Sequence, residues 1–225
     1  MGLLIAFEGP DGSGKTTQVG LLAQHLQSLG HDVLIRREPG GTPIGDQIRA
    51  VLHDVNNVDM TCETEFLLYS ASRAQLVRQI LAPHLARGGV AVCDRFAASS
   101  MAYQGYGRQL DLAAIRTITQ FATGGLTPDL TVYLDLPVEV GIQRKQSAYA
   151  AQTGEWNRLD RQTLDFHQRA RQGYLEMAQA DPNRWLIVDA TQSVADTQAT
   201  IRTRLAPWLM QAGKVASNET HREHR

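Results

Sequence analysis

An eight-residue glycine-rich segment near the N-terminus constrains this chain more than any other feature. Residues 9–16 read Gly-Pro-Asp-Gly-Ser-Gly-Lys-Thr and fit the phosphate-binding pattern G-x-x-x-x-G-K-[ST]. An apolar run precedes the segment at residues 3–7, and apolar residues at helical spacing follow it up to Gly30. Strand, glycine-rich loop and helix in this order are the context that the pattern requires, so we expect a phosphate-binding loop here. The residues that we expect to bind the nucleotide phosphates are Gly9, Pro10, Asp11, Gly12, Ser13, Gly14, Lys15, Thr16 and Thr17.

Two side chains of this loop carry its chemistry. The ammonium of Lys15 would reach the β- and γ-phosphates, and the hydroxyl of Thr16 would ligate Mg²⁺. The chain has three lysines against nineteen arginines, and Lys15 is the only lysine before Lys145. Because a guanidinium does not replace a compact ammonium at such a site, this usage supports the assignment.

Length and composition favour a single domain. Its charge balance shows no excess of basic residues of the kind that binds polyanions. The chain has 225 residues, 43% hydrophobic residues and a formal net charge of −1, with no Pro/Ser/Gly-rich linker. We expect a domain over residues 1–212 and a polar, aperiodic, disordered tail over 213–225. The charge balance argues against nucleic-acid and membrane partners. Cys62 and Cys93 match no metal spacing, and we expect a cytoplasmic protein without a signal peptide or transmembrane segment.

Strand-like and helix-like segments alternate along the chain. Strands are predicted at 3–7, 31–36, 89–93, 130–134 and 185–188. Beyond the helix that follows the loop, helices are predicted at 44–53, 62–86, 111–122, 138–147, 160–180 and 193–211. This alternation predicts an α/β fold of the P-loop NTPase class, with a five-stranded parallel sheet and helices on both faces.

Ligands of such sheets bind at the carboxyl ends of the strands, where polar residues of this chain gather. Asp94 and Arg95 directly follow the third strand, and Glu38 follows the second. Asp94 could hold the hydration shell of Mg²⁺ and Arg95 could clamp a second phosphate, although a surface ion pair would give the same pattern. The chain has neither an N-K-x-D element nor a D-x-x-G element after the third strand, which disfavours a guanine-nucleotide switch.

Four segments in consistent order resemble the thymidylate kinase family. They are Phe7 to Gln18, Arg37 to Thr42 with Arg49 downstream, Asp94 to Gly105, and Leu164 to Tyr174. They are similar to the family's F-E-G-x-D-G-x-G-K-T-T-Q, R-E-P-G-G-T and D-R-[YF]-x-x-S-x-x-A-Y-Q-G segments and to its last segment, and the resemblance spans residues 3 to about 211.

The resemblance implies transfer of the ATP γ-phosphoryl group to dTMP with Mg²⁺, which Thr16 and Asp94 would hold, in a homodimer. The residues are consistent with this chemistry. The acceptor phosphate has its second pKa near 6 and is largely dianionic at neutral pH, so no general base is needed. Alignment and neutralisation of charge remain to be supplied.

The resemblance also implies roles for individual residues. The catalytic candidates are Asp11, Lys15, Arg95, Arg144 and Arg158. The candidates for substrate binding are Asp11, Glu38, Arg49, Tyr69, Arg73, Arg95, Ser100, Tyr103 and Gln104. Helical spacing places Tyr69 and Arg73 on one face, where they would stack on thymine and donate to its carbonyl. Spacing likewise groups Ser100, Tyr103 and Gln104, and by resemblance the ring of Tyr103 would exclude a 2′-hydroxyl.

Residues at about 142–159 resemble the family's lid, which closes over ATP. Members without an arginine in the phosphate-binding loop usually carry several in the lid, and this loop has Gly12 at that position. Arg144 and Arg158 are therefore the leading candidates for the cation at the γ-phosphate, whereas Lys145 could be a solvated surface charge.

Two other functions remain open from the sequence. The first is a kinase for another nucleoside monophosphate, with the same loop and a different base pocket. The second is a P-loop ATPase that acts as a partition or assembly factor, for which phosphate release without an acceptor would be typical.

Overall fold

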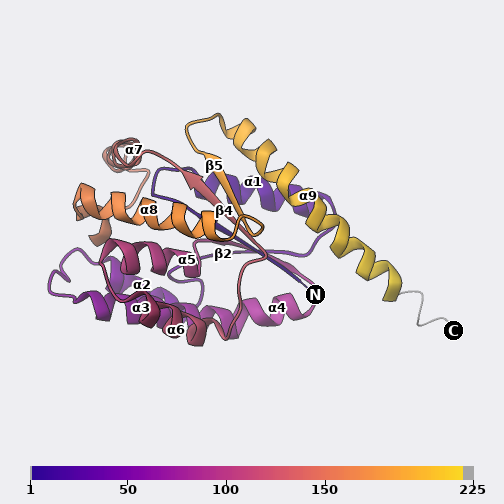
Figure 1. Ribbon diagram of the computed structural model, residues 1–225, viewed down its shortest axis with the longest axis horizontal. Coiled ribbons are helices and arrows are strands. Elements are labelled where there is room, and N and C mark those ends of the chain that lie inside the picture. The colour runs from indigo at the N-terminus through magenta and orange to yellow at the C-terminus, as the bar shows by residue number, and fades with distance from the viewer. Residues whose placement is uncertain (1, 220–225) are drawn as a thin grey trace.

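A computed structural model describes residues 2–219, which form a parallel sheet between two layers of helices (Figure 1). Its five strands stand in the order β2-β3-β1-β4-β5. Ile5 in the central strand lies opposite Val92 on one side and Leu130 on the other. The strands are β1 Leu3–Glu8, β2 Val33–Arg37, β3 Val90–Asp94, β4 Leu130–Asp135 and β5 Trp185–Asp189. The predicted fold class is confirmed.

Alternate residues of the central strand pack against the two helical layers. Leu3, Ile5 and Phe7 join a core formed with α1 (Lys15–Ser28) and α9 (Val194–Glu219). Leu4 and Ala6 face the opposite side, against α3 (Cys62–Leu76), the π-helical turn η1 (Val77–Leu81) and α4 (Ala82–Ala86). Since both of its faces are covered, β1 is apolar from Leu3 to Phe7, as the sequence indicates.

The remaining helices surround the carboxyl ends of the strands or pack beside them. They are α2 Pro43–His53, α5 Ala97–Ser100, the π-helix η2 Met101–Gly107, α6 Leu112–Thr123, α7 Val138–Ala150, the 3₁₀-helix η3 Arg158–Arg161 and α8 Leu164–Ala180. Helix α8 packs along η2, which brings residues far apart in sequence to one place.

The structure differs from the sequence-based expectation in three segments. The predicted helix at 62–86 contains the π-turn η1 just before Pro83, a residue that lacks the backbone N–H needed inside a regular helix. The predicted helix at 160–180 divides into η3 and α8, because Thr163 caps a new helix with its hydroxyl.

At the C-terminus, α9 continues through Glu219, where an aperiodic tail was expected from residue 213. Extending an existing helix needs no new nucleation, so weak periodicity does not end it. The last six residues, 220–225, of the expected tail lie outside the described residues.

Among the helices of residues 2–219, none combines the length and apolar character needed to cross a bilayer.

Candidate active site

The glycine-rich loop lies between β1 and α1, pressed against β4 and α7. Gly9 has φ +140°, and a Cβ there would come 2.6 Å from the carbonyl oxygen of Leu134. Gly12 has φ +81°, and a Cβ there would lie 3.0 Å from Gly141 O and 3.0 Å from the Cβ of Arg144. Both positions combine close approach with a backbone conformation that side chains disfavour, so the sequence pattern reflects a steric requirement.

Lys15 lies buried over the loop. Its Nζ donates to the carbonyl oxygens of Gly9 at 3.0 Å and Pro10 at 2.8 Å. Burial and the neighbouring charge of Arg95 lower the pKa of Lys15 to about 8, although Asp11 opposes this shift. The ammonium therefore sits where the loop would hold phosphate oxygens, and its closest partners are neutral carbonyl oxygens.

Two oxygen atoms that could act as metal ligands lie together beside the loop. The hydroxyl of Thr16, at the start of α1, donates to Asp94 Oδ2 at 2.8 Å, because β3 lies next to β1 and ends level with it. Hydroxyl and carboxylate oxygens suit Mg²⁺, which keeps several water ligands and binds substrate phosphates. No group of three or more His, Cys, Asp or Glu side chains within residues 2–219 could hold a metal ion by itself. The pair fits a metal ion that arrives with a nucleotide.

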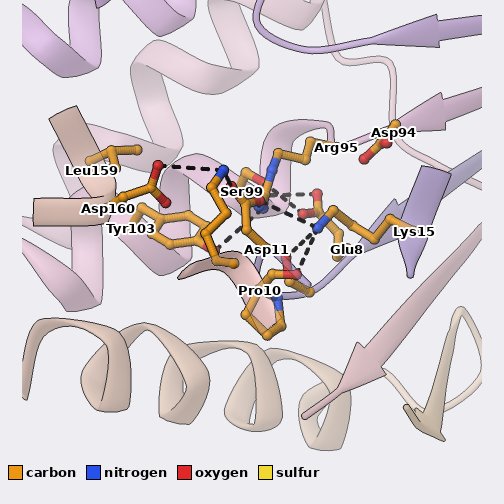
Figure 2. A network of polar contacts seen from close by, with 12 residues as sticks. Glu8, Pro10, Asp11, Lys15, Asp94, Arg95, Ser99, Tyr103, Leu159 and Asp160 are labelled. Carbon is orange, nitrogen blue, oxygen red and sulfur yellow. Dashed lines mark hydrogen bonds and ion pairs between the residues drawn. The ribbon is translucent and has the colours of Figure 1, made fainter. Parts of the chain in front are cut away.

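Asp11 is surrounded by cations from three parts of the chain, of which Lys15 and Arg95 are labelled in Figure 2. Its carboxylate contacts Arg95 Nη2 at 2.6 Å, Lys145 Nζ at 2.8 Å and Lys15 Nζ at 3.7 Å. Burial raises the pKa of Asp11, but Arg95, Lys15 and Lys145 outweigh it and hold that pKa well below its usual value. We call Asp11, Lys15, Arg95 and Lys145 the Asp11 cluster; it carries a net positive charge beside the phosphate-binding loop.

Arg95 reaches this cluster from a strained backbone. Its φ of 72° is rare for a residue with a side chain, and its N–H donates to Phe7 O at 2.9 Å. The guanidinium carbon lies 5.2 Å from the ring centroid of Tyr103. The turn after β3 therefore aims Arg95 at the cavity before α5 begins at Ala97.

Glu8 is a supporting residue that the sequence analysis did not assign. Its buried carboxylate accepts hydrogen bonds from Ser99 Oγ at 2.6 Å, Tyr174 Oη at 2.7 Å and Phe96 N at 2.9 Å. Burial raises the pKa of Glu8 despite the nearby charge of Arg95. An acidic residue ending a fully buried strand was the available signal. Here it holds the turn that carries Arg95.

A cavity opens from the Asp11 cluster between η2, α2, α3 and the segment 151–157. Six of the predicted substrate-binding residues line it away from the loop: Glu38, Arg49, Tyr69, Ser100, Tyr103 and Gln104. Asp11 and Arg95 line its inner end. Residues that the sequence analysis did not single out also line it, among them Trp156 and Asp160.

Arg73 lies behind the cavity wall and is almost completely buried. Its guanidinium donates to Glu38 Oε2 at 2.7 Å, Ser100 Oγ at 2.9 Å and Phe96 O at 3.1 Å. Burial raises the pKa of Glu38 to about 7 although Arg73 lowers it. The structure thus joins three predicted residues, with Arg73 tying the other two together.

The predicted lid divides into parts with different contacts. Arg144, on α7, donates to Gly12 O at 3.1 Å and Ala190 O at 3.2 Å, so it lies at the phosphate-binding loop as expected. Lys145 is no solvated surface charge, because it bridges Asp11 and Asp160.

Arg158 does not lie at the phosphate-binding loop, contrary to expectation. It is buried, and it pairs with Glu65 on α3 and donates to Leu52 O. Arg158 lies in η3, which packs against α2, and this packing turns the side chain toward α3 and away from the loop.

Arg49 is held by Glu155, which lies in the segment predicted to form a lid. Its Nη2 lies 2.9 Å from Glu155 Oε2 and its Nη1 donates to Pro39 O at 3.2 Å. Glu155 follows α7 by five residues and is largely exposed. A carboxylate of the predicted lid therefore occupies the guanidinium that was expected to bind substrate.

Comparison with known proteins gives the family. A model of the thymidylate kinase family matches residues 7–201. The chain belongs to the thymidylate kinase family. It is 52% identical to the thymidylate kinase of Deinococcus radiodurans over 200 residues, covering 89% of this chain and 94% of that protein. It is 47% identical to the thymidylate kinase of Roseiflexus sp. strain RS-1 over 216 residues, covering 93% and 96%. The crystal structure of thymidylate kinase from Ehrlichia chaffeensis matches with a TM-score of 0.73 and 28% identity, covering 91% of this chain and 98% of that one.

The segments that resemble thymidylate kinases converge on this one cavity. The first contributes Asp11, the second Glu38, and the third both Arg95 and Tyr103. The last contributes His167 and Tyr174 from α8. Segments dispersed along the chain thus meet where the carboxyl ends of β1, β3 and β4 lie together.

Proposed function

We propose that this protein transfers the γ-phosphoryl group of ATP to dTMP, giving dTDP and ADP and supplying dTTP for DNA synthesis. The observation that carries the proposal is the Asp11 cluster, because it joins a phosphate-binding loop to a cavity lined by aromatic, amide and charged side chains that suit a nucleotide. Donor and acceptor phosphates that approach from opposite sides would meet there. A loop without such a second site would support hydrolysis only.

The donor side is the glycine-rich loop. Its backbone N–H groups and the N-terminus of α1 would hold the β- and γ-phosphates of ATP, and Lys15 would leave the loop carbonyls to bind them. Arg144, at 3.1 Å from Gly12 O, lies where it can contribute positive charge on closure of the lid. Thr16 and Asp94 would hold Mg²⁺, which when bound neutralises charge on the phosphates.

The acceptor side is the cavity. Arg95 and Arg49 would bind the phosphate of dTMP, in exchange for their present partners Asp11 and Glu155. Tyr69 would pack on the thymine ring, while Tyr103 would lie beside the sugar and Asp11 would accept from its 3′-hydroxyl. Asp11 keeps a pKa well below its usual value, so it stays an acceptor at neutral pH.

Catalysis in this arrangement rests on alignment and charge. The dianionic acceptor needs no general base, so the residues at the junction have to position two anions against their mutual repulsion. Lys15, Arg95 and Arg144 come from three elements and surround the point of transfer. Charges fixed before the reaction in a site that excludes water stabilise the transition state without reorganisation.

A coupled ADP-release assay with a panel of nucleoside monophosphates tests the proposal. We expect dTMP and dUMP to be accepted, with dTMP preferred, and UMP and dCMP to be used poorly. Activity should require a divalent cation and disappear with EDTA. Equal use of UMP or dCMP would favour a general monophosphate kinase. Phosphate release without any acceptor would favour the ATPase alternative.

We also infer a cytoplasmic homodimer. Both cysteines are free, as is usual in a reducing compartment. Phe121 on α6, Leu67 on α3 and Val51 on α2 are exposed apolar side chains on helices that pack in sequence beside the cavity. Light scattering coupled to size-exclusion chromatography would give the mass of a dimer, and a monomer mass would contradict this inference.

A further inference from the structure

Glu65 is the most completely buried acidic residue outside the Asp11 cluster and the Glu8 turn, and the proposed reaction does not use it directly. It lies in the first turn of α3 with 0% exposure. Its Oε1 accepts from Gln104 Nε2 at 2.8 Å and Arg108 Nε at 3.3 Å, and its Oε2 accepts from Arg108 Nη2 at 2.8 Å and from Arg158. We call Glu65, Gln104, Arg108 and Arg158 the Glu65 cluster.

The charge of Glu65 is secured by its partners. Burial raises the pKa of Glu65, but the hydrogen bonds and charges of Arg108 and Arg158 together with the amide of Gln104 bring it below its ordinary value. The carboxylate is thus an acceptor only, at both of its oxygens. Whatever group of Gln104 faces it must be a donor.

This determines the orientation of the Gln104 amide. A glutamine amide has a donor end and an acceptor end, and its neighbours decide which end points where. Since Nε2 donates to Glu65, the carbonyl oxygen Oε1 is left on the other side of the amide, and Gln104 lines the cavity. Among the described residues, Oε1 accepts no hydrogen bond from another side chain or backbone group.

A carbonyl oxygen at this place distinguishes pyrimidines. Thymine and uracil carry an N3–H donor between two carbonyl groups, whereas cytosine carries an unprotonated N3 acceptor next to an amino group. An acceptor from the protein therefore complements N3–H, but it faces another acceptor in cytosine. A buried polar group left unpaired or opposed in this way is what discriminates strongly between similar substrates.

We propose that Glu65 is a positioning residue that holds the amide of Gln104 with its carbonyl oxygen toward the base, and thereby favours thymine over cytosine. The inference rests on the proposed function, because it concerns the base of the acceptor. Arg158 anchors the end of the lid to the same carboxylate. The lid anchor and the base-facing amide therefore share one buried anion.

The test is the ratio of kcat/KM for dTMP to kcat/KM for dCMP in Glu65→Gln. An uncharged amide at position 65 can donate as well as accept, so Gln104 loses its single preferred orientation. We expect the ratio to fall roughly tenfold or more, through a higher KM for dTMP and a lower KM for dCMP, while the KM for ATP stays unchanged. Glu63→Gln is the matched control, because Glu63 lies in the same turn of α3 but is exposed, and it should keep the wild-type ratio.

A second variant separates positioning from folding. Glu65→Asp keeps the negative charge but moves it back by one methylene from Gln104, Arg108 and Arg158. We expect a smaller fall in the ratio than in Glu65→Gln, because the flexible arginines can follow the retained charge and the amide of Gln104 still faces an acceptor. Gln104→Met removes the amide itself and should also lower the ratio. Glu65→Gln added to that variant should then change the ratio no further.

Folded Glu65→Gln or Glu65→Asp protein with the wild-type ratio would overturn the inference, and so would an unchanged ratio in Gln104→Met. A loss of activity equal for both nucleotides would also overturn it, because a merely structural role predicts that result. Failure of the proposed function is distinguishable, since wild-type protein would then not phosphorylate dTMP at all.

Discussion

Two carboxylates of this protein are each surrounded by cations, yet they differ in what lies beyond them. In the Asp11 cluster the side chain of Asp11 is 37% exposed and opens on the cavity. In the Glu65 cluster the side chain of Glu65 is fully buried between α3, η2 and η3. Both have a lowered pKa for the same reason, since cations outweigh the effect of burial.

The difference shows which ion pairs can be exchanged. Arg95 and Lys145 line the cavity beside Asp11, so a phosphate that enters it can accept hydrogen bonds from them. Arg108 and Arg158 cannot leave Glu65 without stranding a buried charge, which costs several kcal/mol. Under the proposed function, the exchangeable ion pairs of Asp11 would bind substrate, and the buried ion pairs of Glu65 would hold side chains in position.

The largest expected effect comes from removing a cation of the exchangeable kind. Lys15→Ala should lower kcat by roughly two orders of magnitude or more, because it removes the positive charge that would neutralise the transferred phosphoryl group in a water-excluded site. Its melting temperature should stay close to that of the wild type, since the ammonium is held only by loop carbonyls and a distant Asp11. Steady-state kinetics with a thermal melt checks both. Near-normal turnover would remove Lys15 from the proposed site.

The two arginines of the lid sharpen the comparison further. Arg144→Ala should lower kcat about tenfold, and more than it raises the KM for dTMP, because the contact forms on closure. Arg158→Ala should instead lower the free energy of unfolding by about 1–3 kcal/mol, since Glu65 loses a charged partner. Arg161→Ala is the control, because Arg161 lies in the same turn but is exposed. A stable Arg158→Ala protein with strongly reduced kcat would show that both arginines act on phosphate.

The pKa of Lys15 gives a pH test of the exchangeable cluster. This pKa is lowered to about 8, so the free enzyme loses the ammonium as the pH rises through that value. The kcat/KM for ATP should therefore fall about threefold between pH 7.5 and 8.5. The kcat should fall only at higher pH, because bound phosphate stabilises the ammonium. A kcat/KM for ATP that stays constant up to about pH 9.5 would contradict the lowered pKa of Lys15.

The smallest effect concerns the lid carboxylate that now holds Arg49. Glu155→Gln should lower the KM for dTMP about twofold, because the substrate phosphate no longer competes with Glu155 for the guanidinium. The gain should shrink at high salt, which screens exposed pairs. Glu139→Gln, an exposed change at the start of α7, should leave the KM unchanged. A raised KM would mean that Glu155 assists binding.

Much of the site could be predicted from local pattern. The glycine-rich loop is encoded by positions where a Cβ would collide, so its sequence carries its structure. Apolar runs that recur between helical segments likewise predict a parallel sheet, because its central strands are covered on both faces. Thr16 Oγ1 and Asp94 Oδ2 lie 2.8 Å apart because Asp94 ends β3 next to β1, and the loop after β1 brings the start of α1 to the same edge of the sheet.

The different positions of the two arginines in the predicted lid could not be predicted from local pattern. Arg144 and Arg158 look alike in a polar, weakly periodic stretch, and nothing local says which of them faces the loop. That outcome depends on where η3 packs and on a partner 93 residues away, Glu65. The environment of Lys145 likewise depends on a distant partner, since Lys145 donates to Asp11, 134 residues away in the sequence.

The sequence by itself thus determined the phosphate-binding loop, the parallel sheet and the residue types available at the ends of its strands, because these follow from short-range sterics and hydrophobic periodicity. Only the tertiary structure decided which charges meet. An ion pair between distant segments depends on how helices pack and on which carboxylate is left buried, and that is a property of the assembled core. The contrast between exchangeable Asp11 and sealed Glu65 exists only once the chain has folded around them.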